Sequence, residues 1–324
     1  MMKHRLILVT GILFLGATFA GQAFAQTAAY PTRVIDLVSA NAAGGGLDFA
    51  LQLFKPRVDK VLGHPMIVNY IATGGGIAGS LQVRAAKPDG YTLLGTTISI
   101  MVSKPLTQKK VPFTLDDFTP IANLTAMPQV MCVKDDSTYK TMTDFINAAR
   151  TKKMTYATPG AYTNCHILME TLSRAARFQA IHIPQKGASA GSVAVMGGHI
   201  DMLVSAASGF IGPGKLRPLA VAEEERLPDM PDVPTLKELG YPIVITSFDS
   251  IWGPKGIPKE IQDVLFKAFT KAYADNKQEM DKAAKAGDQR VLVLDGPETK
   301  KQYQIQYDLF KKILPELGVG GEQK

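Results

Sequence analysis

Short apolar runs alternate with helical patterns through the first third of the chain. Apolar residues such as Leu47, Leu51, Phe54 and Val58 recur at helical spacing, which predicts a helix over residues 47–62. A strand is predicted before this helix, over residues 34–40. After it, the pattern predicts a second strand over 66–71, a helix over 77–86 and a third strand over 91–96. This βαβαβ order is typical of a mostly parallel sheet covered by helices.

A second α/β series follows. It is predicted to contain strands over 129–134, 154–158, 180–183, 200–205 and 216–222, and helices over 143–151, 164–177 and about 189–196. A strand over 243–252 is long enough to cross between two lobes, and helices over 258–274 and 297–317 return to the first lobe. We therefore expect an α/β fold of two lobes, with residues 26–125 plus 246–324 in lobe 1 and residues 126–245 in lobe 2.

The first 25 residues have the pattern of a cleavable signal peptide. A basic start, Lys3 to Arg5, precedes an apolar run over Leu6–Ala20, and Ala23-Phe24-Ala25 provides an A-x-A cleavage site. A membrane helix needs about 20 consecutive apolar residues, and no later stretch approaches that length. No Cys follows the cleavage site, so we expect an exported protein without a lipid anchor.

The charge is mildly basic and dispersed. Loss of Lys3 and Arg5 with the leader lowers the formal net charge from +7 to +5, because the leader has no acidic residue. Lysine doublets are few, with Lys109-Lys110 and Lys152-Lys153 the main ones before the C-terminal helices. This distribution argues against nucleic-acid binding and leaves a small preference for anionic ligands.

The cysteines and histidines give no sign of a metal site. Cys132 and Cys165 could form a disulfide in an oxidising compartment, but Cys132 lies in the apolar run 130–133, as buried free thiols commonly do. The spacing of His64, His166, His182 and His199 does not match a metal site. We expect neither a metal nor a cofactor.

A first candidate ligand loop runs from Ala42 to Asp48, between a predicted strand and helix. Ligands of open α/β sheets bind at such places, and glycines let backbone N–H groups and the positive end of the helix dipole approach an anion. The loop matches neither G-x-G-x-x-G nor the P-loop pattern, which argues against a nucleotide. A glycine turn used only for packing is the alternative. Asp48 is expected to accept backbone hydrogen bonds and position the loop.

A second candidate loop spans residues 157–166. Thr158, Thr163 and Asn164 can all form side-chain hydrogen bonds, and an N-cap explains only one of the last two. His166 is either a cap or core residue or a ligand group. Both loops lack Lys and Arg.

The segment Gly187-Ala188-Ser189-Ala190-Gly191 fits the G-x-S-x-G motif of serine hydrolases. That motif needs a strand leading straight into its first glycine, and residues 184–186 intervene here. Only His199 follows Ser189, and it precedes Asp201, so no triad order is evident. We interpret Ser189 as a helix N-cap, with a secreted hydrolase as the alternative function.

Several motifs together resemble the Bug-type receptors of tripartite tricarboxylate transporters. They are Tyr30-Pro31, residues 43–48, Gly74-Gly75-Gly76-Ile77-Ala78-Gly79, residues 87–94, residues 118–122, residues 183–187, residues 214–221 and residues 227–235. The resemblance covers nearly the whole chain after the leader. It implies a periplasmic Venus-flytrap protein that binds a small carboxylate, largely through backbone groups and water, and delivers it to inner-membrane transporter subunits.

The resemblance also implies the site. The two loops would contribute Ala42, Ala43, Gly44, Gly45, Gly46, Asp48, Thr158, Gly160, Tyr162, Thr163, Asn164 and His166. Positions after two further strands would contribute Thr96, Thr97 and Ser99, and Ser205, Ala206 and Ala207.

Some positions depart from the family pattern. Residues 41–43 replace the usual Phe-Ala-Pro, Ile77 replaces a polar residue, and Tyr162 is bulkier than the usual residue, which points toward an aromatic or more apolar carboxylate. We expect a monomeric binding protein without catalytic activity for a di- or tricarboxylate or an aromatic acid. A sensor that presents its ligand to a signalling partner is a further alternative.

Overall fold

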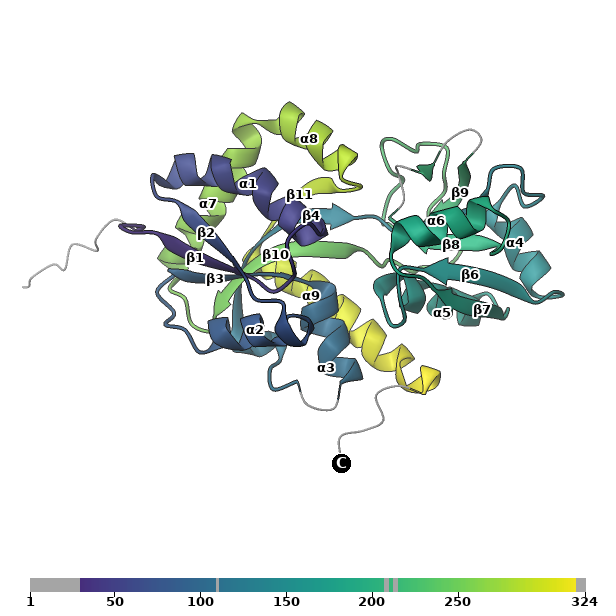
Figure 1. Ribbon diagram of the computed structural model, residues 1–324, viewed down its shortest axis with the longest axis horizontal. Coiled ribbons are helices and arrows are strands. Elements are labelled where there is room, and N and C mark those ends of the chain that lie inside the picture. The colour runs from purple at the N-terminus through teal and green to yellow at the C-terminus, as the bar shows by residue number, and fades with distance from the viewer. Residues whose placement is uncertain (1–29, 109–110, 207–209, 212–214, 319–324) are drawn as a thin grey trace, which may run out of the picture.

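The computed structural model describes residues 30–108, 111–206, 210–211 and 215–318. The signal peptide predicted at residues 1–25 lies outside these ranges. Within them, no helix has both the length and the apolar character needed to cross a membrane. The chain forms two β-sheets with helices packed on both, and Figure 1 shows them as two bodies joined by extended segments. We call the six-stranded sheet with its helices lobe 1, and the five-stranded sheet with its helices lobe 2.

The lobe 1 sheet has the strand order β11-β4-β10-β3-β1-β2. Its strands are β1 (Ile35–Ser39), β2 (Met66–Tyr70), β3 (Thr92–Thr97), β4 (Phe118–Met127), β10 (Ser247–Pro254) and β11 (Arg290–Asp295). The pairs β1/β2 and β1/β3 are parallel, with Leu37 opposite Val68 and Leu93. The pairs made by β10 with β3 and β4, and by β11 with β4, are antiparallel.

The lobe 2 sheet has the order β7-β6-β8-β5-β9. Its strands are β5 (Val130–Lys134), β6 (Met154–Thr158), β7 (Ala180–Pro184), β8 (Met202–Ser205) and β9 (Leu216–Val221). Here β6 pairs in parallel with β7 and β8, and β5 pairs antiparallel with β8 and β9.

The two-lobed α/β fold is confirmed, and most strands of each sheet run in one direction: β1 to β4 in lobe 1, and β6 to β9 in lobe 2. Each sheet is nevertheless mixed, because β10 and β11 in lobe 1 and β5 in lobe 2 run against the other strands. The lobe boundaries at residues 125/126 and 245/246 stay a prediction. In the structure, β4 continues to Met127 and β10 begins at Ser247.

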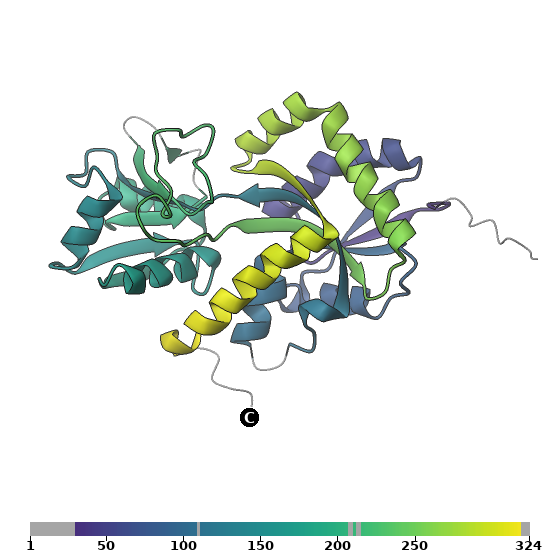
Figure 2. The ribbon, with the colours of Figure 1, turned by 180° about the vertical axis from the view of Figure 1, so that it is seen from behind.

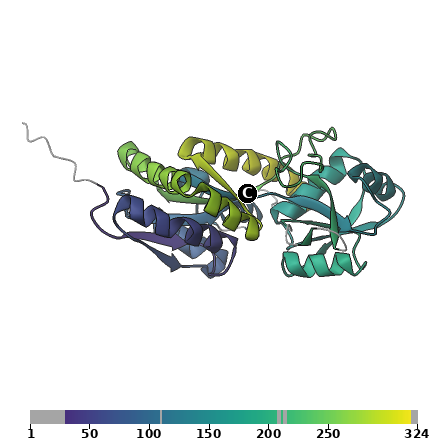
Figure 3. The same cartoon turned by 90° about the horizontal axis from the view of Figure 1, so that it is seen from above.

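The helices lie on both faces of each sheet (Figures 1 and 3). They are α1 (Gly46–Leu62), α2 (Ile77–Arg84), α3 (Lys104–Thr107), α4 (Met142–Ala149), α5 (Asn164–Ala175), α6 (Ala188–Met196), α7 (Lys259–Asp275), α8 (Lys277–Ala286) and α9 (Gly296–Ile313). One core lies between the lobe 1 sheet and the helices α1, α7 and α8, where Phe54 packs near Phe269. In lobe 2, α6 covers a smaller core against the five-stranded sheet.

The remaining core is continuous across the two lobes. It joins Leu94 and Trp252 of lobe 1 to Tyr156 and Leu168 of lobe 2, with Phe310 of α9 in the same cluster. Figure 2 shows α9, in yellow, extending from lobe 1 toward lobe 2. Burial of large apolar side chains in one cluster couples the stability of the two lobes.

Four of the helices and strands were not predicted from the sequence: α3, β4, α8 and β11. β4 is buried on both faces and includes the polar Asn123 and Thr125, so its pattern does not alternate. The side-chain N–H of Asn123 donates to the Leu292 carbonyl oxygen of β11 at 2.7 Å, a partner far away in the sequence. α8 is rich in charged residues and buries only Met280 and Ala284.

Two glycines test how closely the backbone is packed in lobe 1. Gly63 and Gly76 both have left-handed backbones, with φ of 70° and 96°, which costs an alanine about 1–2 kcal/mol. A Cβ at Gly63 has no atom within 4 Å, whereas one at Gly76 would lie 2.5 Å from the Ala40 carbonyl oxygen. We predict that Gly76→Ala lowers the free energy of unfolding by about 1–3 kcal/mol more than Gly63→Ala does. Urea unfolding of both variants measures this, and equal losses would contradict the packing described.

Candidate functional site

The first loop leaves the backbone at the start of α1 exposed. Gly45 is the N-cap of α1, and Ala42, Ala43 and Gly44 before it are exposed. The extended backbone of Gly45, with φ of −93° and ψ of 179°, sets no requirement for glycine. Glycine here instead leaves the space outside the helix N-terminus open, so N–H groups and the positive helix dipole can reach an anion.

Asp48 holds this loop in place. Its Oδ2 accepts a hydrogen bond from the Gly44 N–H at 2.7 Å, and its Oδ1 accepts one from the Tyr70 hydroxyl at 2.6 Å. Partial burial opposes the charge, but these hydrogen bonds keep the pKa of Asp48 below its usual value. The carboxylate therefore acts as expected, as a positioner of the loop, while the cap position itself belongs to Gly45.

The second loop is built around the N-cap of α5. Thr163 is this cap: its hydroxyl oxygen accepts from the His166 N–H, and its own proton goes to the Gly160 carbonyl oxygen at 2.9 Å. Tyr162 lies in the left-handed region with φ of 58°, and its N–H donates to Nδ1 of His166 at 2.9 Å. The Tyr162 side chain is 38% exposed.

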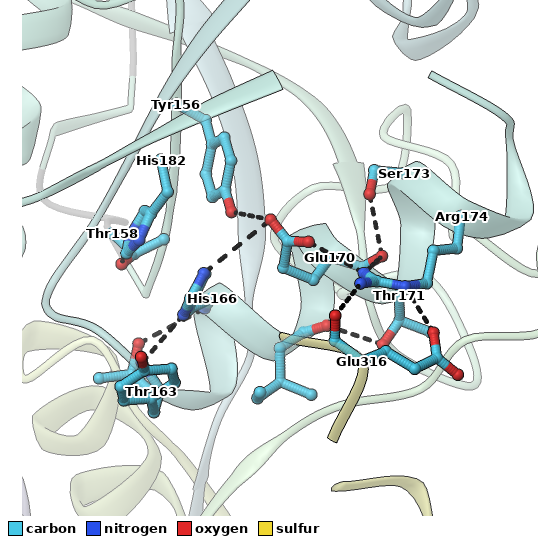
Figure 4. A network of polar contacts seen from close by, with 12 residues as sticks. Tyr156, Thr158, Thr163, His166, Glu170, Thr171, Ser173, Arg174, His182 and Glu316 are labelled. Carbon is cyan, nitrogen blue, oxygen red and sulfur yellow. Dashed lines mark hydrogen bonds and ion pairs between the residues drawn. The ribbon is translucent and has the colours of Figure 1, made fainter. Parts of the chain in front are cut away.

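A polar network lies beneath the second loop (Figure 4). The imidazoles of His166 and His182 stack with centroids 3.9 Å apart and planes inclined by 15°. Nε2 of His182 is 2.7 Å from the Thr158 hydroxyl, and Nε2 of His166 is 3.9 Å from Oε1 of Glu170. Burial lowers the pKa of both histidines, and the neighbouring His166 helps lower that of His182 to about 4. His182 was not among the predicted site residues.

The two loops abut the same crossover between the lobes. At the first loop, a Cβ on Gly46 would lie 3.3 Å from the Met127 sulfur, and the Gly46 carbonyl oxygen accepts from Gln289 at 2.8 Å. At the second loop, the Asn164 side chain donates to the Ser247 hydroxyl at 3.1 Å. Met127 and Ser247 are opposite each other in β4 and β10, so the structure brings both loops to one place.

The amide of Gln129 completes this contact region. It donates to the Met127 carbonyl oxygen at 2.7 Å and to the Ser247 hydroxyl at 3.3 Å, and its oxygen lies 2.7 Å from the Cys165 sulfur. Sequence reasoning missed both Gln129 and Gln289. The contact of Gln289 with Gly46 joins residues 243 positions apart in the sequence. No local pattern could have revealed that contact.

Thr96 and Thr97 end β3 close to a buried carboxyl group. The hydroxyls of both threonines are buried without a partner among the described residues. Asp249 is opposite Thr97 in the neighbouring strand and accepts from the Thr125 hydroxyl at 2.9 Å. Complete burial raises the pKa of Asp249 to about 7. Asp249 was missed, although a single acidic residue within the predicted strand 243–252 was a usable signal.

Ser205 and Ala206 lie at the end of β8, where the Ser205 hydroxyl donates to the Ala206 carbonyl oxygen at 3.3 Å. Ala206 also borders a cavity of about 630 Å³ between the lobes, which includes Gln289, Arg290 and Tyr273 of lobe 1. This cavity contains only Ala206 of the predicted residues, so it lies beside the two loops rather than at them. Ser99 is exposed just after β3, and Ala207 lies outside the described residues.

The interpretation of Ser189 as a helix N-cap is wrong. Ser189 is not the N-cap of α6, because Gly187 holds that position and Ser189 lies in the first turn. Within the described ranges, the Ser189 hydroxyl has no hydrogen bond to a histidine or a carboxylate.

Cys132 and Cys165 are buried free thiols, so the disulfide alternative is wrong. The same ranges contain no group of three or more side chains suited to hold a metal ion.

Comparison with known proteins places this architecture in a family. The model of the tripartite tricarboxylate transporter family receptor matches residues 52–319. The chain belongs to this receptor family. A UPF0065 protein from the gbd 5′ region of Cupriavidus necator is 36% identical over 252 residues, which covers 76% of this chain and 77% of that protein.

Solved structures of other proteins share the fold. A TctC solute-binding protein from Polaromonas, with no ligand, superposes with a TM-score of 0.81 at 28% identity, over 89% of this chain and 99% of that one. Two proteins from Rhodopseudomonas palustris are more distant: Rpa4515 with adipate has a TM-score of 0.72 at 21% identity, and MatC with bound malate 0.66 at 23%. They cover 90% and 88% of this chain and 99% of their own chains, and at this identity they show the fold alone.

The buried imidazoles predict a pH dependence of stability. The pKa of His182 falls from 6.5 in its ordinary state to about 4 in the fold, so between these values the unfolded chain binds more protons than the native one. Stability should then decrease as the pH falls from 6.5 toward 4 and be fully present above 6.5. In His182→Gln, whose amide can still donate to Thr158, the loss between pH 6.5 and 5 should be smaller. Urea midpoints at the two pH values measure this, and identical losses would argue against a neutral His182.

Proposed function

We propose that the protein is a periplasmic solute-binding protein that captures a small organic carboxylate between its lobes and delivers it to a tripartite membrane transporter. The observation that carries the proposal is the meeting of two strand-to-helix loops without Lys or Arg, 42–48 and 158–166, at the crossover near Met127 and Ser247. Each loop ends at the N-terminus of a helix, where unpaired N–H groups and the helix dipole favour an anion.

The proposed ligand contacts come from backbone N–H groups and short hydroxyl and amide side chains. Neither loop contains Lys or Arg, so the charge of the ligand is met by partial charges held in fixed positions. Four to six hydrogen bonds to a charged group at about 1.5–3 kcal/mol each, less the costs of closure and immobilisation, leave about 8 kcal/mol. That corresponds to a micromolar Kd, which suits a receptor that scavenges nutrients.

Membership in the receptor family supports delivery to a transporter, and the leader-like residues 1–25 support a place in the periplasm. Adipate and malate in the two Rhodopseudomonas palustris proteins make small dicarboxylates the first ligands to try. We propose that the protein acts as a monomer and has no catalytic role. Presentation of the ligand to a signalling partner is the remaining alternative for what happens after binding.

A thermal-shift screen tests the proposal directly. Adipate, malate, citrate and benzoate are added at millimolar concentration, with the corresponding neutral amides as matched controls. A carboxylate at 100 times its Kd adds about 2.7 kcal/mol to the free energy of unfolding, which should raise Tm by several degrees. The neutral amides should leave Tm unchanged. Absence of a shift with every carboxylate would count against the proposed class of ligand.

Two variants of similar size locate the site. Gly45→Val fits the extended backbone, and the added Cβ has only the Ala42 carbonyl oxygen near it, at 3.8 Å. The fold should therefore persist while the side chain covers the start of α1 and removes the carboxylate response. Ser189→Val, in the first turn of α6, should keep the full response. An equal response in Gly45→Val and wild type would refute the loop assignment, and labelling of Ser189 by a fluorophosphonate would favour the hydrolase.

A further inference from the structure

The stacked histidines beneath the second loop hold that loop by two different hydrogen bonds. Nδ1 of His166 accepts the Tyr162 N–H, and Nε2 of His182 contacts the Thr158 hydroxyl. Figure 4 shows the two rings side by side, with His166 pointing along α5 toward Glu170. Thr158 and Tyr162 both belong to the proposed ligand loop, so the imidazoles support the site from behind.

These contacts define where the protons lie. Because Nδ1 of His166 is an acceptor, its proton must be on Nε2, which faces Glu170. The Thr158 hydroxyl donates to the Gly160 carbonyl oxygen at 2.8 Å, so it accepts from His182, whose proton is also on Nε2. Both rings are neutral in this arrangement. At a separation of 3.9 Å, two positive charges would repel, so the pair takes up at most one proton.

Groups with opposite effects on the charge of His166 surround its ring. Glu170 favours a positive imidazole, but its carboxylate already accepts from the Tyr156 hydroxyl at 2.7 Å and pairs with Arg174 at 2.9 Å. Burial and the neighbouring Arg174 oppose the positive imidazole and lower the pKa of His166. Tyr162, on the loop, contributes only its N–H and its neutral ring. An added negative charge at the loop therefore tips the balance toward the protonated state.

We propose that His166 is a positioning residue that takes up a proton when the site binds its carboxylate. The proposal rests on the function proposed above. A proton added to Nδ1 ends its role as an acceptor, so the Tyr162 N–H is released. Nδ1–H and the Tyr162 N–H then become two donors beside the N-terminus of α5, where a carboxylate can accept from both.

Linkage makes this coupling reciprocal. If a bound anion raises the proton affinity of His166, a bound proton raises the affinity for the anion by the same factor. Affinity for a carboxylate should thus increase about threefold to tenfold as the pH falls from 7.5 to 6. A ligand that carries a constant charge over this range, such as benzoate, separates this effect from ligand titration.

Isothermal titration calorimetry in buffers of different ionisation enthalpy tests the proposal. Benzoate and adipate are titrated at pH 6.5 in phosphate, in imidazole and in Tris, and the slope of the observed enthalpy against buffer enthalpy gives the number of protons taken up. We expect an uptake of a substantial fraction of one proton per ligand for the wild type. His166→Asn keeps an acceptor near the Nδ1 position for the Tyr162 N–H but cannot titrate, so its uptake should be close to zero. His199→Asn, at an exposed histidine, should match the wild type.

The outcomes distinguish the two proposals. Binding of either acid without proton uptake, or with equal uptake in His166→Asn, overturns the role of His166 and leaves the carboxylate receptor intact. Absence of binding by both acids and by the whole thermal-shift panel overturns the receptor and, with it, the role of His166. If His166→Asn does not fold, the titration of His166 in the His182→Gln variant tests the proposal instead. Loss of the stacked neighbour should raise the pH at which the His166 Cε1 proton signal titrates, and an unchanged titration overturns the proposal.

Discussion

The rest of the structure depends on a small group of buried polar side chains at the crossover. The Asn164 side chain at the start of α5 donates to the Thr246 carbonyl oxygen at 3.2 Å, and Gln306 of α9 donates to the same oxygen at 2.8 Å. These amides are nearly inaccessible to solvent, so leaving one unpaired costs about 1–3 kcal/mol. Because this requirement fixes α5, α9 and the start of β10 against one another, it also fixes where the two loops meet.

The proposed anion site contains no lysine or arginine, and this would have consequences for selectivity. A lysine or arginine would attract many anions, whereas N–H groups in a fixed arrangement favour one that fits their directions. In the first loop Asp48 supplies this rigidity, and in the second loop Thr163 and the stacked imidazoles supply it. A carboxylate such as Asp48 beside an anion site is compatible with binding because its oxygens are directed at Gly44 and Tyr70.

Local patterns were sufficient to predict the βαβ units and both loops. The helix over Asn164–Ala175 and its cap are encoded by neighbouring residues, and Thr163 indeed caps it. Other features join residues distant in sequence: the antiparallel pairing of β10 with β4, the contact of Gln289 with Gly46, and the stacking of His166 on His182. Composition and periodicity contain no information on such pairs. Misassignment of Ser189 had a different cause, since the N-cap position has a φ of 100°, which favours the glycine found at position 187.

The order of strands has a consequence for how the two sheets assemble. All strands of the five-stranded sheet lie within residues 130–221, so that sheet can close as soon as this part of the chain is free. In the other sheet β10 lies between β3 and β4, and its late position in the sequence leaves those two strands unjoined until residue 254 is present. As the chain emerges from its amino terminus, therefore, the half that contains that terminus is the last to be completed, and its apolar strands need protection until the carboxyl-terminal quarter is available.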